Sequence, residues 1–455
     1  MNRHFDAIVI GAGQAGPAMV GRLAASQTVA LIERDLIGGT CVNTGCTPTK
    51  ALVASAYAAH LARRAMDFGV KVGPVGVDFT AVMVRKNGIV GNSRSHLTAW
   101  LEGMANCTVI RGHARFLSPT AVQVGDEVLE AERFFINVGG RATLPDFPGR
   151  DQVRTLTNTT LLELDDLPKR LVVVGGSYVG LEFAQIFRRL GAEVTVVEKA
   201  ARLVSREDEE VSDAIREILE AEGIEIRLDS ECIQFEPRGA EIAVGVNCAS
   251  GEPEVLGSHV LLAVGRRPNT DDLGLEAAGV KVDAHGYIVV DESLKTSVPY
   301  IWALGDCNGR GAFTHTSYND FEVAAANLLD GAERKVSDRI PVYALYVDPP
   351  LGRVGLTETE ARAKGHAVRI GRRPMTRVGR AIEKGETKGF MKVVVDRDSD
   401  AILGGAVLGV GGDEAIHGVI EAMAAGVTAS AYTRVVPIHP TVSELVPTTF
   451  GELSP

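Results

Sequence analysis

Two cysteines, Cys41 and Cys46, lie five residues apart in the segment GGTCVNTGCTPTK, and the whole chain has only six cysteines. Pro48 suits the first turn of a helix, so the sequence predicts that Cys46 begins a helix and that Cys41 lies on the turn before it. The positive end of the helix macrodipole would favour a thiolate at Cys46. A pair placed in this way could act as a redox-active dithiol.

Two other kinds of site also use closely spaced cysteines. A structural disulfide is uncommon in a reducing compartment, and a metal site usually has further cysteine or histidine ligands nearby. Glycines at positions 38, 39 and 45 let the backbone pass close to a flat ring. Lys50, one turn beyond Cys46, would place a cation beside that ring, with Glu182 as its possible partner. A redox-active dithiol is therefore favoured, while the two alternatives stay open.

An internal repeat supplies the elements that would position this chemistry. Residues 6–34 and 170–199 each contain a β-branched run, a glycine turn, an amphipathic helical stretch, a second β-branched run and a glutamate. This order is typical of a βαβ unit, and it occurs twice. The residues from about 336 onward alternate turn signals with β-branched runs and then give a helical pattern, which predicts a separate α+β domain.

The first repeat carries a nucleotide-binding pattern. Gly11, Gly13 and Gly16 follow the strand directly, where they permit a tight turn, a close approach of a pyrophosphate and close packing of helix on strand. Glu33 lies 22 residues after Gly11, placed to accept a hydrogen bond from a ribose hydroxyl. A glycine triplet also occurs in plain turns, but the complete strand–helix–strand–acid order favours a dinucleotide site.

The second repeat departs from this pattern. It reads GGSYVG from Gly175 to Gly180, with Ser177 at the middle glycine, whose Cβ atom narrows the approach to the backbone. Glu198 occupies the strand end, and a carboxylate there favours NADH over NADPH because it repels a 2′-phosphate. The alternative is a βαβ unit that has lost its ligand. Two dinucleotide sites in one chain predict a nicotinamide that delivers hydride and a bound flavin that receives it.

The bulk composition excludes other classes of protein. A chain of 455 residues predicts roughly two to four domains. The net charge of −11 disfavours a sequence-independent nucleic-acid binder, which should be basic. No apolar run is long enough for a membrane span, and the short, glycine-rich apolar run near the N-terminus predicts a strand and turn instead of a signal peptide. A cytoplasmic location is therefore expected.

Residues 38–50 resemble the active-site signature of the class I flavin disulfide reductases, the family of dihydrolipoamide dehydrogenase, glutathione reductase and mercuric reductase. The resemblance covers essentially the whole chain, because the family's later landmarks are matched in order by residues 265–269, 296–306 and 439–444. It implies an α/β fold with two Rossmann-like dinucleotide-binding domains, for FAD and NAD(P), and a C-terminal α+β dimerisation domain. The expected ranges are 1–148 and 269–335 for FAD, 149–268 for NAD(P) and 336–455 for dimerisation.

The resemblance also implies roles for individual residues. Cys46 would be the thiol next to the flavin, and Cys41 would be the thiol that attacks the substrate. Lys50 and Glu182 match an ion pair beside the flavin. His439 would be the general acid–base, held by Glu444 and contributed by the other subunit of a homodimer; the bond between His439 and Pro440 is a candidate cis peptide. Further residues expected at the cofactors are Gly39, Thr40, Gly139, Asp306, Thr314 and His315 for FAD, and Tyr178, Gly265 and the second glycine turn for NAD(P).

Two segments near these residues depart from the family's usual pattern. Residues 137–140 read NVGG where the family usually has an ATG-type turn. Thr314 and His315 precede a helix expected from Ser317, and the backbone N–H of His315, not its ring, is expected to matter.

The function implied is transfer of electrons from NAD(P)H through FAD and the cysteine pair to a small disulfide or related oxidant. Residues 38–50 and the tail HPTVSELVP lean toward the mercuric-reductase-like branch, which includes the reactive-chlorine-resistance flavoproteins. A mercuric reductase would carry a C-terminal cysteine pair, and no cysteine follows Cys307 here. Dihydrolipoamide dehydrogenase, a mercuric or cupric ion reductase and a non-catalytic flavoprotein sensor are the alternatives.

Overall fold

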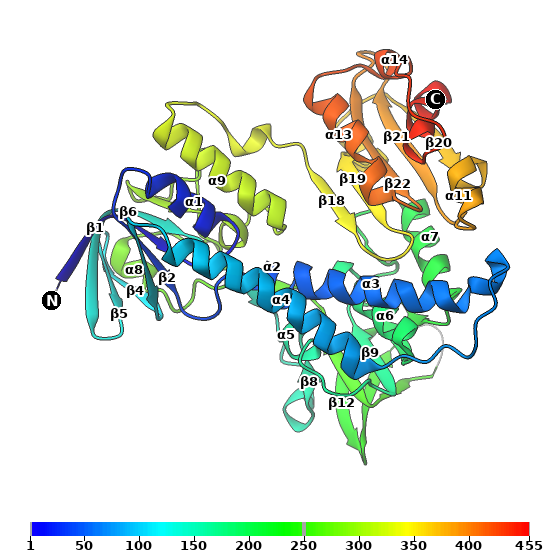
Figure 1. Ribbon diagram of the computed structural model, residues 1–455, viewed down its shortest axis with the longest axis horizontal. Coiled ribbons are helices and arrows are strands. Elements are labelled where there is room, and N and C mark those ends of the chain that lie inside the picture. The colour runs from blue at the N-terminus through cyan, green and yellow to red at the C-terminus, as the bar shows by residue number, and fades with distance from the viewer. Residues whose placement is uncertain (1, 248–251, 455) are drawn as a thin grey trace. The chain divides into compact units, whose positions relative to one another are not determined.

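The computed structural model describes residues 2–247 and 252–454, which divide into two units (Figure 1). Unit 1 comprises residues 1–51, 83–143 and 265–339, and unit 2 comprises residues 52–82, 144–264 and 340–455. The expected NAD(P)-binding and dimerisation domains thus fall mostly in one unit, and the predicted division into domains stays a prediction. Helix α3 (Cys46–Arg63) begins in unit 1 and ends in unit 2, and helix α4 (Phe79–Glu102) begins in unit 2 and ends in unit 1.

A seven-stranded sheet with the order β3-β2-β1-β6-β5-β4 forms the centre of unit 1, and β17 pairs with β6. The strands β1, β2, β3, β6 and β17 pair in parallel, whereas β4 and β5 are antiparallel. The strand bounds are β1 Asn2–Ile10, β2 Val29–Glu33, β3 Cys107–Arg111, β4 Ala114–Ser118, β5 Ala121–Val124, β6 Glu127–Ile136 and β17 Ile301–Ala303. A small antiparallel pair joins β7 (Gly140–Ala142) to β16 (Arg266–Pro268).

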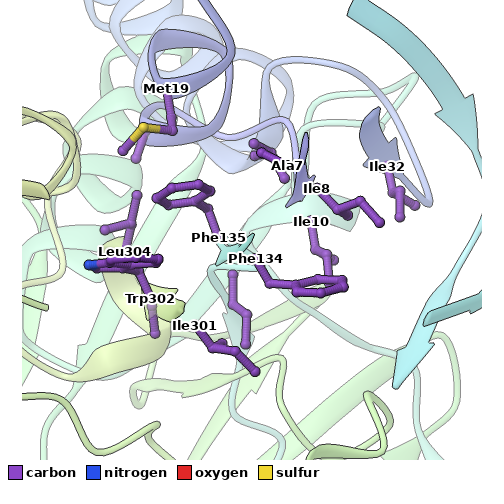
Figure 2. Packing of buried hydrophobic residues seen from close by; sticks show 14 of the residues in the cluster. Ala7, Ile8, Ile10, Met19, Ile32, Phe134, Phe135, Ile301, Trp302 and Leu304 are labelled. Atoms are coloured by element: carbon purple, nitrogen blue, oxygen red, sulfur yellow. The ribbon is translucent and has the colours of Figure 1, made fainter. Parts of the chain in front are cut away.

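The core of unit 1 lies on both faces of this sheet. Successive side chains of a strand point to opposite faces, so Phe134 and Phe135 of β6 enter different layers. Phe134 packs against Phe116 with ring centroids 5.2 Å apart, and Phe135 stacks on Trp302 at 5.1 Å. Figure 2 shows Phe135 and Trp302 with Met19 of α1 close by. Burial on both faces is typical of a parallel sheet covered by helices.

The helices of unit 1 connect and cover these strands. Helix α1 (Ala15–Leu23) joins β1 to β2, and it packs beside α9 (Thr314–Leu329) (Figure 1). The shorter helical segments are α2 Gly39–Thr44, α8 Leu275–Ala278, η3 Gly305–Asn308 and η4 Val336–Asp338.

Unit 2 contains a second parallel sheet with the order β11-β10-β9-β15-β8. Its strands are β8 Thr155–Leu156, β9 Arg170–Val174, β10 Glu193–Val197, β11 Glu225–Arg227 and β15 His259–Leu262. Helix α6 (Tyr178–Leu190) joins β9 to β10, and α7 (Glu209–Glu220) joins β10 to β11. A three-stranded antiparallel sheet follows, formed by β12 Glu231–Arg238, β13 Glu241–Asn247 and β14 Glu254–Gly257. Both predicted βαβ units are therefore confirmed.

The C-terminal part of unit 2 is an antiparallel sheet with the order β18-β19-β22-β21-β20. Its strands are β18 Val342–Leu345, β19 Leu351–Gly355, β20 Val368–Pro374, β21 Phe390–Asp396 and β22 Ile402–Leu408. The helix expected after β22 is broken at Ile416 into α12 (Gly412–Ala415) and α13 (His417–Ala424). The remaining short segments of unit 2 are η1 Ala65–Phe68, η2 Arg150–Gln152, α5 Asn158–Leu161, α10 Glu358–Ala363, η5 Met375–Arg377, α11 Gly379–Glu383, α14 Ala429–Tyr432, η6 Ser443–Leu445 and α15 Val446–Gly451.

Buried ion pairs join the C-terminal antiparallel sheet of unit 2 to the segment that precedes α7. The ammonium of Lys392 on β21 is 1% exposed and lies 3.0 Å from Asp208, which precedes α7, and 2.9 Å from Glu358. Breaking a buried pair of this kind leaves an uncompensated charge and costs about 3–5 kcal/mol, so the contact with Asp208 fixes the C-terminal sheet against the parallel-sheet part of unit 2. Over the described residues, no helix combines the length and apolar character needed to cross a bilayer.

Candidate active site

The first glycine turn lies between β1 and α1 and is closed by backbone atoms. Gly11 has a φ angle of +103°, and a Cβ atom there would lie 2.2 Å from the carbonyl oxygen of Asn137. A Cβ atom at Gly16 would lie 2.1 Å from the carbonyl oxygen of Gly11, and one at Gly13 would lie 3.0 Å from the side chain of Asn137. The turn and the close packing of α1 on β1 thus require glycine, as the sequence predicts.

Glu33 braces this turn from the end of β2. Its carboxylate accepts hydrogen bonds from the backbone N–H groups of Ala12, at 2.7 Å, and Asp35, at 2.8 Å. Helix α1 has no side-chain cap at its N-cap residue, Gln14. A narrow backbone turn, an uncapped helix N-terminus and an acid at the next strand end fit the pyrophosphate and ribose of a dinucleotide.

Asn137 also positions the first glycine turn. The sequence indicated this residue only because residues 137–140 differ from the turn that the family usually has. Its Oδ1 atom accepts a hydrogen bond from the backbone N–H of Gly16 at 3.0 Å, and its Nδ2 atom donates to the carbonyl of Leu304 at 2.8 Å. The residue is 5% exposed. Asn137 therefore ties the glycine turn to the segment that carries Asp306. A buried polar residue directly after a parallel strand was the available signal.

The cysteine segment folds as two consecutive helices. Gly38 and Gly39 have positive φ angles of +103° and +59°, and the chain turns there into α2, which carries Cys41. Helix α3 then begins at Cys46, as predicted. The expected turn at Cys41 is wrong, because the two glycines complete the reversal before that residue and the chain is already helical.

The two sulfur atoms and one hydroxyl form a connected group. Among the described cysteines, Cys41, Cys46, Cys107 and Cys307 carry thiols. The Sγ atom of Cys46 lies 3.1 Å from Oγ1 of Thr314. The side chain of Cys41 is hydrogen-bonded to Cys46, and this bond, burial and negative charge on Cys46 raise the pKa of the Cys41 thiol. The raised pKa keeps the proton on the Cys41 thiol.

Helix α9 begins beside this pair. It starts at Thr314, three residues before the expected start at Ser317, because the hydroxyl of Thr316 accepts a hydrogen bond from the backbone N–H of Phe313 and closes the first turn early. The sulfur of Cys46 thus lies at the N-termini of both α3 and α9, where helix dipoles favour negative charge. His315 is exposed, and its ring stacks on Phe313 at 5.4 Å, while the expected role of its backbone N–H stays a prediction.

Asp306 lies in η3, directly after β17. Burial raises the pKa of its carboxyl group, and the guanidinium of Arg266 lies 3.8 Å away. Gly305 has a φ of +75°, and its backbone N–H donates to Asp320 at 2.8 Å. Asp306 is therefore held at the carboxyl end of the sheet of unit 1, where ligands of such sheets bind.

The other residues of unit 1 expected at the cofactors are Gly39, Thr40 and Gly139 for FAD and Gly265 for NAD(P). A Cβ atom at Gly39 would lie 2.8 Å from the Cα atom of Gly13, so the cysteine segment passes directly over the glycine turn. Thr40 follows on α2. The carbonyl of Gly139 accepts a hydrogen bond from Asn269 at 3.0 Å, and that of Gly265 accepts one from Thr143 at 2.9 Å.

Lys50 and Glu182 belong to different units. Lys50 lies on α3, one turn beyond Cys46. Glu182 lies on α6, is 6% exposed and accepts a hydrogen bond from the backbone N–H of Tyr346 at 3.0 Å. Their pairing stays a prediction.

The second glycine turn repeats the first. A Cβ atom at Gly175 would lie 2.4 Å from the carbonyl oxygen of Ala263, and one at Gly180 would lie 2.0 Å from that of Gly175. Glu198 follows β10 and accepts hydrogen bonds from the backbone N–H groups of Gly176 and Ala200. Ser177, which replaces the middle glycine, is the exposed N-cap residue of α6 and makes no capping hydrogen bond with its side chain. The serine therefore faces outward without disturbing the turn.

His439 and Glu444 lie in unit 2 close to the C-terminus. The Nδ1 atom of His439 lies 2.9 Å from a carboxylate oxygen of Glu444. The side chain of His439 is 82% exposed and that of Glu444 is 10% exposed. The peptide bond to Pro440 is cis, as predicted. A fixed carboxylate thus orients an imidazole whose other nitrogen faces outward, an arrangement suited to proton transfer.

Known protein families match two parts of the chain. Residues 5–324 match the pyridine nucleotide-disulphide oxidoreductases, and residues 342–450 match the dimerisation domain of these enzymes. The chain belongs to this family. Membership implies FAD and a pyridine nucleotide as cofactors, and the dimerisation domain supports a homodimer.

Similar members of the oxidoreductase family carry different names. The chain is 35% identical over 437 residues to a mercuric reductase of Streptomyces lividans, covering 94% of this chain and 92% of the relative. It is 36% identical over 444 residues to a dihydrolipoyl dehydrogenase of Thermus scotoductus, covering 97% and 95%. A solved Cu(II) complex of the HOCl-induced flavoprotein disulfide reductase RclA from Escherichia coli matches with a TM-score of 0.90 and 33% identity, over 99% of both chains. The expected α/β fold class is therefore confirmed, and the class of enzyme is an oxidoreductase.

Proposed function

We propose that the protein reduces a small disulfide or a related oxidant with NAD(P)H, using Cys41 and Cys46 as the electron relay. The observation that carries the proposal is the connected group of Cys41, Cys46 and Thr314 at two helix N-termini, directly over a glycine turn that fits FAD. When bound, FAD would take hydride from the reduced nicotinamide and pass an electron pair to the cysteine pair. The chain's own residues carry the remaining steps.

In the reduced pair, Cys46 holds the thiolate, stabilised by the hydroxyl of Thr314 and the two helix dipoles. Cys41 keeps its proton and needs a base before it can attack. His439 of the partner subunit removes that proton, and the Cys41 thiolate attacks the substrate disulfide to form a mixed disulfide. The leaving thiolate takes the proton from His439. Cys46 then attacks the Cys41 sulfur of the mixed disulfide, which restores the Cys41–Cys46 disulfide and releases the second product as a thiolate that takes a proton from solvent.

The pyridine nucleotide is NADH in this proposal. The carboxylate of Glu198 is fixed at the second strand end by two backbone N–H groups. A fixed negative charge at that place accepts from a free 2′-hydroxyl and repels a 2′-phosphate.

Reduction of a metal ion is a second candidate, supported by the names of the relatives. One relative is named a mercuric reductase, and one matching structure is a Cu(II) complex. A thiol pair is a soft ligand set for such ions. The described part of the chain holds no cluster of three or more His, Cys, Asp or Glu residues suited to a metal, so an ion would meet the cysteine pair as a substrate.

Anaerobic titration with NADH tests the relay. The proposal expects the wild-type enzyme to take up two hydride equivalents per FAD, one for the flavin and one for the disulfide. Cys41→Ser should take up one and keep diaphorase activity while losing disulfide reduction. A panel of lipoamide, glutathione disulfide, other small disulfides, Hg(II) and Cu(II) then identifies the oxidant. Full disulfide turnover by Cys41→Ser would contradict the proposal.

A further inference from the structure

A second group of polar side chains lies behind the second glycine turn, in unit 2. Tyr178 is the first residue of α6, next to the uncapped Ser177, where the helix N-terminus would face a pyrophosphate. Its ring meets the ring of Tyr343 on β18 edge-on, with centroids 5.4 Å apart. The two tyrosine side chains are also hydrogen-bonded to each other.

Tyr343 is itself held by a buried ion pair. Its hydroxyl donates to Oε1 of Glu207. The other carboxylate oxygen, Oε2, accepts from Nη2 of Arg353 on β19 at 2.6 Å and from its Nε at 3.1 Å. The side chains of Glu207 and Arg353 are 0% and 1% exposed. A buried carboxylate must have both oxygens satisfied, so Tyr343 supplies the partner for the oxygen that Arg353 does not contact.

The direction of the hydrogen bonds follows from the donors that are present. An ionised carboxylate accepts only, so the single hydroxyl proton of Tyr343 is committed to Glu207. Burial and the charge of Glu207 raise the pKa of Tyr343, which keeps that proton in place. The hydroxyl of Tyr178 must therefore donate to the oxygen of Tyr343. The order is Tyr178 to Tyr343 to Glu207, closed by Arg353.

The loop that carries Glu207 also contacts the glycine turn directly. The backbone N–H of Val204 donates to the carbonyl of Gly176 at 2.9 Å, and the N–H of Glu207 donates to the carbonyl of Val204 at 2.8 Å. A Cβ atom at Gly176 would lie 2.7 Å from the side chain of Leu203. The buried ion pair is thus connected to the turn through the backbone as well as through the tyrosines.

We propose that Tyr343, Glu207 and Arg353 are positioning residues for the pyridine nucleotide. They hold Tyr178 in one orientation at the start of α6 and so preorganise the second glycine turn before the nucleotide binds. This inference rests on the proposed function, because it assigns that turn to NAD(P)H. Loss of the tether should weaken nucleotide binding, since the ordering of Tyr178 would then accompany each binding event.

Tyr343→Phe tests the proposal, because it keeps the ring contact and removes the hydroxyl link. For the FAD-loaded enzyme, we expect the Kd for NAD⁺ from calorimetry and the KM for NADH to rise about fivefold, the value of one hydrogen bond. The kcat and the KM for the disulfide should stay within about twofold, because the cysteine pair is untouched. Tyr178→Phe should raise the Kd for NAD⁺ by a similar factor, and the Kd of the double variant should be no higher than that of Tyr178→Phe alone.

Tyr57→Phe is the matched control, because Tyr57 also donates to a glutamate of unit 2, Glu386, at 3.0 Å. It should lower the melting temperature without changing nucleotide binding. Equal effects of Tyr343→Phe and Tyr57→Phe on the Kd, or additive effects of Tyr178→Phe and Tyr343→Phe, would overturn the inference. The proposed function would survive either outcome, because the wild-type enzyme would still reduce disulfides with NADH. A wild-type enzyme that binds no NAD⁺ would overturn both this inference and the proposed function.

Discussion

The Sγ atom of Cys46 lies 3.1 Å from the Oγ1 atom of Thr314, a residue 268 positions further along the chain. A hydroxyl at this distance can donate to a thiolate, and hydrogen bonds to charged groups contribute about 1.5–3 kcal/mol. Thr314 is also the first residue of α9, so the same contact brings a helix dipole to the sulfur. We therefore predict that Thr314 controls the reactivity of the Cys46 thiol.

Thr314→Val should therefore reduce the thiolate content of the reduced pair. We expect the rate at which iodoacetamide alkylates Cys46 at pH 7 to fall roughly tenfold. Valine has the same side-chain shape as threonine but cannot donate the hydrogen bond to the thiolate. Thr314→Ser, which retains the hydroxyl, should remain within about threefold of the wild type. An unchanged alkylation rate in Thr314→Val would show that the hydroxyl does not stabilise the thiolate.

His439 should act on the cysteine pair of the partner subunit. His439→Ala and Cys41→Ser homodimers should each lose disulfide reduction, the former by about 10²–10⁴-fold in kcat. Unfolding and refolding the two variants together forms mixed dimers, each with one complete site, so that about a quarter of wild-type turnover should return. Disulfide turnover of the refolded mixture measures this. If each site used its own subunit's histidine, no activity would reappear.

Asn137 should be needed for retention of FAD. Asn137→Ala removes the acceptor for Gly16 and the donor for Leu304, leaving two buried backbone groups without their partners. We expect a loss of about 2–4 kcal/mol in unfolding free energy and a lower FAD-to-protein absorbance ratio. Asn106→Ala is the control, because the exposed Asn106 makes a single side-chain hydrogen bond, to Ala24, away from the turn. Equal FAD content in both variants would contradict this role.

Stability should fall at acid pH through Asp208. Burial opposes ionisation, but hydrogen bonds from Lys392 and from the backbone of Thr359 and Glu358 prevail and lower the pKa of Asp208 to about 2. Because the folded pKa lies below the unfolded value of 3.8, the stabilisation is full above about pH 4 and is lost as the pH falls through 2. It amounts to about 2 kcal/mol.

Denaturant unfolding between pH 7 and pH 2 measures this contribution. Asp208→Asn should be less stable than the wild type at pH 7 and should lose less stability on acidification. Asp213→Asn, on the exposed face of α7, is the control and should follow the wild-type curve. Parallel curves for the wild type and Asp208→Asn would assign the acid sensitivity to other groups.

Glu198 should set the preference for NADH. Glu198→Ala removes the charge that repels a 2′-phosphate, so the ratio of kcat/KM for NADPH to that for NADH should rise roughly tenfold. Steady-state kinetics with both coenzymes measures this ratio. Glu193→Ala, at the exposed start of β10, should leave the ratio unchanged. A ratio that does not move in Glu198→Ala would place coenzyme choice elsewhere.

Local features of the sequence predicted much of this structure. Pro48 correctly indicated a helix that begins at Cys46, and the spacing of Gly11, Gly16 and Glu33 correctly indicated a strand, a tight turn and a helix. These features depend on steric limits and helix capping within a few residues. The start of α9 was misplaced because its first turn is closed by a threonine side chain that has no distinctive spacing signal.

Contacts between distant segments could not be predicted from residue types. No local pattern links Thr314 to Cys46, or Tyr343 to Glu207, because each pair meets only after the sheets have formed. Asn137 was visible as an unusual residue. Its two hydrogen bonds form only once α1 and the residues that follow β17 pack against the end of β6. The tertiary structure, and not the motif, defines these contributions.

The acid at each strand end has a consequence for how the two repeats can diverge. Glu33 and Glu198 each hold their own glycine turn through backbone N–H groups, although the middle position is Gly13 in one repeat and Ser177 in the other. The second turn thus keeps its backbone hydrogen bonds although Ser177 replaces the middle glycine. A substitution at the middle position can therefore change the surface beside the turn while the carboxylate at the next strand end keeps the backbone in place.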